Sequence, residues 1–157
     1  RARARGPQRR RAPAMTEPRV VRAARLWIGT PSLHQASAQG AGCDCLGLVR
    51  GVWRDVWGQE PAPVPPYTAD WSEPQGEERL WDAARRILRP GRGEAGDLLL
   101  FRMRAGSVAK HLGIQSHAGA SPRFIHAMSR HGVLESPLSG PWAARVAARF
   151  DLESGRS

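Results

Sequence analysis

A cysteine at the start of an amphipathic segment is the residue of this chain best placed for chemistry. Cys45 follows Asp44, an aspartate that can cap a helix, and the apolar residues after it recur at helical spacing. The first N–H groups of a helix have no partner inside it and carry partial positive charge. A thiolate is stabilised there, so we expect the pKa of Cys45 to fall below its ordinary value of about 8.5.

Histidines could supply the base and the orienting group that a nucleophilic thiol requires. The chain has five: His34, His111, His117, His126 and His131. His117 and His131 fall in predicted turns and are interpreted as solvated side chains. His111 and His126 fall in predicted strands, and histidines on neighbouring strands can touch side by side. A single histidine in a strand is more often structural. Together with a cysteine at a helix start, however, His111 and His126 are each candidates for the base and for the orienting group.

The positive charge of the chain is concentrated at its beginning. The net charge is +10, and residues 1–14 hold six arginines and no acid. Without them 18 basic residues face 14 acidic ones, a charge of +4. Lys110 is the only lysine, so we favour codon bias in a GC-rich genome over a selected phosphate-binding surface. Nucleic-acid binding through this arm is kept as an unfavoured alternative, which predicts affinity that falls steeply with salt.

The length fits one domain with a real core. We expect residues 1–14 to be a disordered or untranslated extension, with translation from Met15, and residues 15–157 to form the domain. No apolar run approaches the roughly 20 residues of a membrane span, and no signal peptide is visible. The protein is therefore expected to be made in the cytoplasm and not to insert into a membrane.

The two cysteines cannot build a disulfide framework. Cys43 and Cys45 are two positions apart, a spacing too short for an unstrained bridge and unlike the C-x-x-C spacing of zinc and redox sites. Zinc held by both cysteines and two histidines is an alternative, and it is not favoured. The sequence thus predicts no metal and no cofactor.

The pattern of elements predicts an α+β fold, with N-terminal helices packed on an antiparallel sheet. Helices are expected over 18–28, 45–57 and 77–88, with a proline-rich loop over 59–76. Short strands are expected over 97–103, 111–115, 124–128 and 133–136, and residues 142–152 fit either a helix or a strand. Thr16 is the expected cap of the first helix. Gly113 shares a strand face with His111 and is expected to leave room for a substrate backbone.

Three sequence blocks resemble those of the NlpC-type cell-wall peptidases, a branch of the papain-like cysteine peptidases. Asp44-Cys45-Leu46-Gly47-Leu48-Val49 resembles the Asp-Cys-Ser-Gly-Leu-Val nucleophile block of that family, with leucine in place of serine. The Gly-Asp-Leu strand of 96–101 followed by His111-Leu112-Gly113-Ile114 resembles its histidine strand. Ile125-His126-Ala127 resembles the strand that carries the third polar residue. The match spans about residues 20–150.

The resemblance implies a papain-like NlpC-type fold and a division of roles. Cys45 would be the nucleophile, His111 the general base and acid, and His126 the residue that orients His111. The tyrosine that often follows the Thr-Pro segment of the family is absent, since Ser32 and Leu33 stand after Pro31. Gln35, with the backbone N–H of Cys45, is the expected substitute as oxyanion donor. The substrate implied is the peptide stem of peptidoglycan, often the bond between D-glutamate and the diamino acid.

A narrower resemblance is to the cell-wall peptidases of tailed phages and gene transfer agents. It rests on the stretch from Cys43 to Trp53, on His34-Gln35-Ala36-Ser37 and on the proline-rich segment after Trp57. It implies a component of a phage-like tail, with tail hub or baseplate proteins as partners, carried to the bacterial cell wall by the particle. The alternatives are a structural tail-hub subunit with a vestigial peptidase fold, and an amidase or acyltransferase acting on another amide.

Overall fold

The computed structural model describes residues 16–62 and 76–155. The predicted extension over 1–14, the start at Met15 and most of the proline-rich loop lie outside the described residues. The elements, in chain order, are α1 (Arg19–Trp27), β1 (Ser37–Ala38), β2 (Gly42–Cys43), α2 (Cys45–Trp57), α3 (Arg79–Ile87), β3 (Asp97–Phe101), β4 (His111–His117), β5 (Arg123–Met128), β6 (Gly132–Pro137), α4 (Pro141–Ala144) and β7 (Val146–Asp151).

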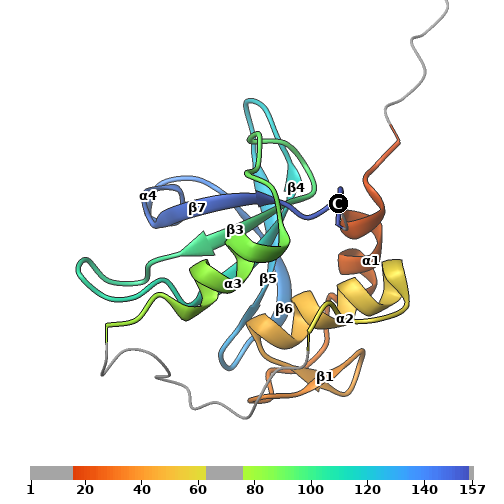
Figure 1. Ribbon diagram of the computed structural model, residues 1–157. Helices are drawn as coiled ribbons and strands as arrows, with labels where there is room; N and C mark the ends of the chain where they lie inside the picture. The colour runs from red at the N-terminus through yellow and green to blue at the C-terminus, as the bar shows by residue number, and fades with distance from the viewer. Residues whose placement is uncertain (1–15, 63–75, 156–157) are drawn as a thin grey trace, which may run out of the picture.

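A five-stranded antiparallel sheet forms the centre of the molecule. Its strand order is β6-β5-β4-β3-β7, and β1 and β2 form a separate two-stranded ribbon. The helices α1, α2 and α3 lie against the sheet, and the short α4 leads into β7 (Figure 1). The prediction of an α+β fold, with N-terminal helices packed on an antiparallel sheet, is confirmed.

The two faces of the sheet are covered by different clusters. On one face Leu98, Leu100, Leu112 and Ile114 join the apolar side chains of α1 and α2 in the main core. On the other face a smaller cluster contains Leu99, Phe101, Phe124 and Leu138, with Trp142 of α4 packed against it. All five residues of β3 are buried for this reason. None of the helices in the described ranges is both long and apolar enough to cross a membrane.

Helix α2 begins and ends where its sequence predicts. Asp44 caps it, because its Oδ1 accepts the backbone N–H of Gly47 at 2.7 Å. Gly58 closes it in the left-handed region, with φ 79°. Helix α1 differs, because Pro18 stands at its N-cap and the distant carboxylate of Glu153 accepts the N–H groups of Arg19 and Val20, at 3.1 and 3.0 Å. The prediction that Thr16 caps this helix is therefore wrong.

The remaining differences come from short or ambiguous segments. Residues 142–152 contain the last residues of α4 and then β7, which pairs with β3 at the edge of the sheet. The ribbon of β1 and β2 was not predicted, since two-residue strands leave no periodic signal. His117 ends β4 rather than lying in a turn, and its Nε2 is 3.1 Å from Arg25.

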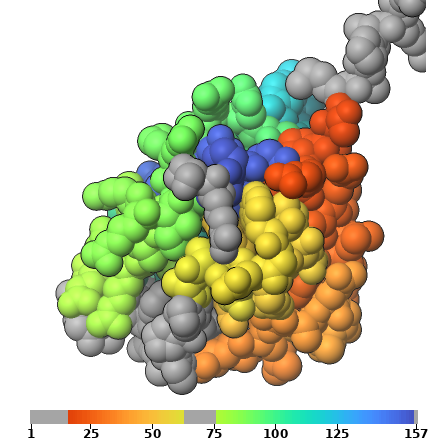
Figure 2. All heavy atoms as spheres, turned by 45° about the vertical axis from the view of Figure 1, so that its right-hand side comes forward, coloured from red at the N-terminus to blue at the C-terminus, as the bar shows by residue number. Residues whose placement is uncertain are grey.

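Two glycines let α2 pack closely against the N-terminal segment. A Cβ at Gly51 would collide with the Trp27 ring, whose Nε1 donates to Asp55 at 2.9 Å. A Cβ at Gly47 would collide with the carbonyl oxygen of Ala36. Figure 2 shows α2 in yellow between the orange N-terminal segment and the green region of α3. These contacts fix the start of α2, and with it Cys45.

We predict that Gly47→Ala destabilises the protein by about 1–3 kcal/mol, because the new methyl group meets backbone that cannot rotate away. At an open helix position the same change stabilises by about 1 kcal/mol. The sign of the change in the free energy of unfolding therefore shows whether Gly47 is closely packed. The measurement is the free energy of unfolding in urea, and an unchanged or increased value would contradict the close packing described.

Candidate active site

The thiol of Cys45 lies where the first turn of α2 meets the start of β4. Cys45 is half-buried, and its Sγ donates to the carbonyl oxygen of Lys110 at 3.6 Å. The backbone N–H of Leu112 is also directed at the sulfur. The thiol therefore sits beside the main chain of His111, between the residues that flank it.

Asp44 connects this helix start to the loop before β1. Its Oδ2 accepts the backbone N–H of Gln35 at 2.7 Å, while its Oδ1 caps the helix. Gln35 has φ 63°, a backbone conformation that is uncommon for a residue with a side chain. The side-chain Nε2 of Gln35 lies 3.3 Å from Nε2 of His34. The structure thus places the Gln35 backbone at the nucleophile block, and its role as an oxyanion donor stays a prediction.

His111 and His126 form a direct contact across β4 and β5. Nε2 of His111 lies 2.9 Å from Nδ1 of His126, and the rings meet edge to face at 81°. Gly113 lies beside this pair, but the space next to it is filled. A Cβ there would come within 2.8 Å of Cδ2 of Phe124 and 3.4 Å of Cβ of His126. The expectation that Gly113 leaves room for substrate is wrong, because the Phe124 ring and the Cβ of His126 fill that space.

Aromatic rings enclose the two imidazoles. Trp142 of α4 lies 5.5 Å from the His111 ring centroid and 4.9 Å from that of His126. Phe101 lies 5.6 Å from His111, and Phe124 lies 4.1 Å from His126. His126 is fully buried and His111 is half-buried. The pair is therefore shielded on the face of the sheet opposite to α2.

This enclosure lowers the pKa of both histidines. Burial takes the pKa of His111 to about 4. Burial, followed by the charge of His111, takes the pKa of His126 to about 3. Both rings are thus neutral at neutral pH. In a neutral ring one nitrogen donates and the other accepts, so the contact between them is a hydrogen bond in one of two directions.

Burial raises the pKa of the Cys45 thiol to about 11. The neighbouring charge of Asp44 acts in the same direction, whereas the N–H groups of Leu112, Leu46 and Cys45 itself stabilise the thiolate and act against it. The expectation that the helix start lowers this pKa is wrong, because the loss of water outweighs the helix N–H groups. The resting site is a neutral thiol beside neutral imidazoles.

The structure brings the two predicted histidines into direct contact, but the hydrogen bond of the thiol goes to the main chain rather than to their rings. His111 and His126 are in contact, and Cys45 lies against the backbone on either side of His111. The thiol is bonded to the Lys110 carbonyl rather than to the His111 ring. Catalytic hydrogen bonds are often loose in substrate-free enzymes and tighten when the complex forms. Proton transfer to His111 would require the thiol to turn from the Lys110 carbonyl towards the imidazole.

Two further residues at the site were not predicted from the sequence. Oγ of Ser136 lies 2.9 Å from Nε2 of His126. Trp142 covers both rings from α4. Alternation along 133–136 could have placed Ser136 on the same face as His126, given the strand pairing. The contact of Trp142 depends on a helix of four residues that has no periodic signal.

Cys43 differs from Cys45 in its surroundings. It lies in β2, has no exposed surface and belongs to the main core. Burial, together with the charges of Asp44 and Cys45, raises the pKa of the Cys43 thiol to about 11. In the part of the chain that the structure describes, no group of three or more His, Cys, Asp or Glu side chains could hold a metal ion.

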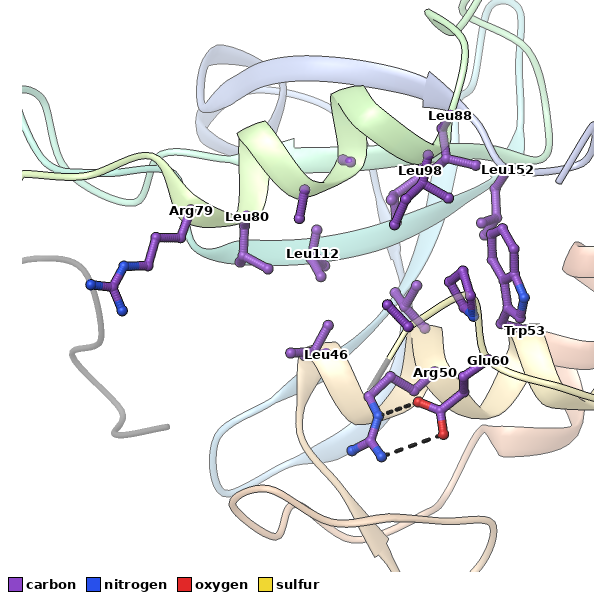
Figure 3. Close-up of a pocket in the computed structure, with 16 residues that line it drawn as sticks. Leu46, Arg50, Trp53, Glu60, Arg79, Leu80, Leu88, Leu98, Leu112 and Leu152 are labelled. Atoms are coloured by element: carbon purple, nitrogen blue, oxygen red, sulfur yellow. Dashed lines mark hydrogen bonds and ion pairs between the residues drawn. The ribbon is translucent and has the colours of Figure 1, made fainter. Parts of the chain in front are cut away.

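An apolar pocket of about 250 Å³ lies between α2 and α3, on the helix-covered face of the sheet. Leu46 and Leu112, the residues that follow Cys45 and His111, are part of its wall. Leu80 of α3 and Leu88, directly after α3, close it on that side, and the ion pair of Arg50 with Glu60 lies at its rim (Figure 3). The pocket and the histidine rings therefore lie on opposite faces of the sheet.

We predict that Cys45 reacts slowly with iodoacetamide at neutral pH. Because the thiolate is the reactive form and the pKa of Cys45 is raised to about 11, the rate should rise about tenfold per pH unit from pH 7 to pH 10. The measurement is the alkylation rate in a Cys43→Ala background, which leaves one thiol. A plateau below pH 7 would reveal a thiolate–imidazolium pair instead.

Comparison with known protein families finds no family model that matches the chain. Among curated proteins, the chain is 30% identical over 142 residues to the gamma-DL-glutamyl hydrolase of Bacillus subtilis strain 168. The match covers 88% of this chain and 30% of the relative. The chain thus spans less than a third of the length of this relative.

Two solved structures are similar in fold. One is an NLP/P60 family protein from Staphylococcus aureus subsp. aureus Mu50, with a TM-score of 0.53, 22% identity, and coverage of 84% of this chain and 39% of that one. The other is the NlpC/p60 domain of the peptidoglycan hydrolase SagA, with a TM-score of 0.52, 24% identity, and coverage of 85% and 95%. The chain therefore has the fold of NlpC/P60 domains.

Proposed function

We propose that this protein is a cysteine peptidase that hydrolyses the peptide stems of peptidoglycan. The observation that carries the proposal is the hydrogen-bonded pair of His111 and His126 beside a cysteine at the start of α2. The fold supports it, because a structure of the same fold is described as a peptidoglycan hydrolase domain. The name of the Bacillus relative further supports a γ-linked D-glutamyl bond as the bond cleaved.

His111 is the proposed base and acid. Its Nε2 is engaged with His126, so Nδ1 is the nitrogen that can take the thiol proton. Because the thiol and the imidazole are both neutral at rest, this proton moves as the sulfur attacks the substrate carbonyl. The C–S bond forms, and the imidazolium of His111 then protonates the leaving amine as the C–N bond breaks. Water hydrolyses the thioester with His111 again as the base.

The proposed oxyanion site lies at the helix start. The backbone N–H of Cys45 points out of the first turn of α2, where it has no helical partner. Gln35 is the proposed second donor, since its backbone is tied to Asp44 next to Cys45. Donors fixed before the reaction stabilise the developing charge without rearranging during it. On the other face of the sheet, Trp142 packs against the ring of His126.

We predict that Cys45→Ala abolishes release of stem-peptide fragments from purified peptidoglycan, a loss of at least about 1,000-fold, because the nucleophile is removed. Cys43→Ala is the matched control and should retain activity, because that thiol is enclosed in the core. The measurement is mass spectrometry of the soluble fragments, which also identifies the bond cleaved. Equal release by both variants, or none by the wild type, would contradict the proposal.

We further propose that the protein acts as part of a phage-like tail of the gene transfer agent type, which delivers it to the cell wall. The support is the sequence resemblance around Cys43–Trp53 and 34–37. The structural alternative, a tail-hub subunit whose fold has lost its activity, is favoured by one observation. Leu26, Ile28 and Leu33, at the end of α1 and in the loop after it, expose 69%, 44% and 56% of their surface.

We expect particles purified from the encoding bacterium to contain this protein in a fixed ratio to the tail subunits. Particles that carry Cys45→Ala should assemble normally but fail to open the cell wall. The measurements are quantitative proteomics of gradient-purified particles and a delivery assay. Normal delivery by these particles, combined with failed assembly when the gene is deleted, would favour the structural alternative, and absence from particles would contradict both.

A further inference from the structure

A hydrogen-bonded chain of side chains continues beyond the histidine pair to the edge of the sheet. His111 contacts His126 through Nε2 and Nδ1 at 2.9 Å, and Nε2 of His126 contacts Oγ of Ser136 at 2.9 Å. The three residues come from the neighbouring strands β4, β5 and β6. Ser136 pairs with Phe124 across β5 and β6, so its side chain is a diagonal neighbour of His126 on the same face.

The direction of these hydrogen bonds decides whether His111 can act as a base. In one arrangement His111 donates from Nε2 to His126, which donates from its own Nε2 to the Ser136 oxygen. The lone pair on Nδ1 of His111 is then open to accept the thiol proton. In the opposite arrangement Ser136 donates to His126, which donates to His111. Nδ1 of His111 then already carries a proton and cannot accept another.

The surroundings satisfy every group of the first arrangement. His126 is fully buried, so a proton on its Nε2 needs the Ser136 oxygen as its acceptor. Ser136 is half-exposed, and its own hydroxyl proton can go to water. In the second arrangement the hydroxyl proton of Ser136 is committed to His126, and Nδ1 of His111 carries a proton instead of a lone pair.

The charged state of His111 allows the first arrangement alone. Once His111 holds a second proton, both of its nitrogens donate, so Nδ1 of His126 must accept and its Nε2 must donate. An acceptor at Ser136 is then required, and a buried N–H without one destabilises the imidazolium. We infer that Ser136 is a positioning residue, the final acceptor of a relay that holds His126 as the Nε2–H tautomer and His111 in its basic form. This role rests on the proposed function only where activity is measured.

The test compares Ser136→Thr and Ser136→Val in the purified full chain. Threonine and valine have the same shape, but valine has a methyl group where threonine has its hydroxyl. Long-range 15N–1H spectra of the imidazoles report the tautomer of His126 without any substrate. We expect the Nε2–H form in the wild type and in Ser136→Thr, and a shift towards Nδ1–H in Ser136→Val. Ser136→Ala serves in place of the valine variant if near-UV circular dichroism shows that valine disturbs the fold.

In the hydrolysis of peptidoglycan we expect Ser136→Val to lower kcat about 10- to 100-fold with KM unchanged, and Ser136→Thr to restore it. Ser116→Ala, which removes a buried serine hydroxyl from β4, is the control and should leave both values near those of the wild type. An Nδ1–H tautomer in the wild type, or equal behaviour of the threonine and valine variants, would overturn the assignment. If the wild type releases nothing, the proposed function fails while the tautomer result still decides the role of Ser136.

Discussion

The two hydrogen bonds accepted by the Asp44 carboxylate hold the candidate active site in place. One oxygen caps α2 and the other holds the backbone of Gln35, so a single side chain joins the helix that begins with the thiol to the loop that flanks it. The glycine at position 47 then allows this helix to lie directly on the backbone of that loop. The sulfur reaches β4 because the helix cap, the bond to the Gln35 backbone and the absent side chain at Gly47 act together. A change in any of these three features moves the thiol relative to His111.

Burial sets the electrostatics of the site more strongly than the helix does. The thiol is kept neutral and so are both imidazoles, although the helix N–H groups alone would favour a thiolate. In an enclosed site of this kind the thiol stays in its protonated, less nucleophilic form. The aromatic wall of Phe101, Phe124 and Trp142 has a second effect, since it leaves His126 fully buried, with His111 and Ser136 as its polar partners.

Local signals in the sequence predicted most of the fold. The limits of α2 were predicted to the residue, because Asp44 is a strong start signal and Gly58 a strong stop signal on either side of a periodic segment. The contact of His111 with His126 followed from two strands with histidines on one face. The features that could not be predicted from the sequence depend on contacts between residues far apart in the chain. The raised thiol pKa, the filled space beside Gly113 and the cover from Trp142 all arise from residues far apart in the chain.

The positions of these contacts along the chain have a consequence for folding. His111 and His126 are 15 residues apart, and His126 and Ser136 are 10 apart, within strands joined by short hairpins. Cys45 and Lys110 are 65 apart. Closing the longer loop costs about 1.5 kcal/mol more in chain entropy than closing the shorter ones. We therefore expect the strands that carry His111, His126 and Ser136 to pair before Cys45 docks beside them, so that the candidate site of a newly made chain forms only when the core has closed.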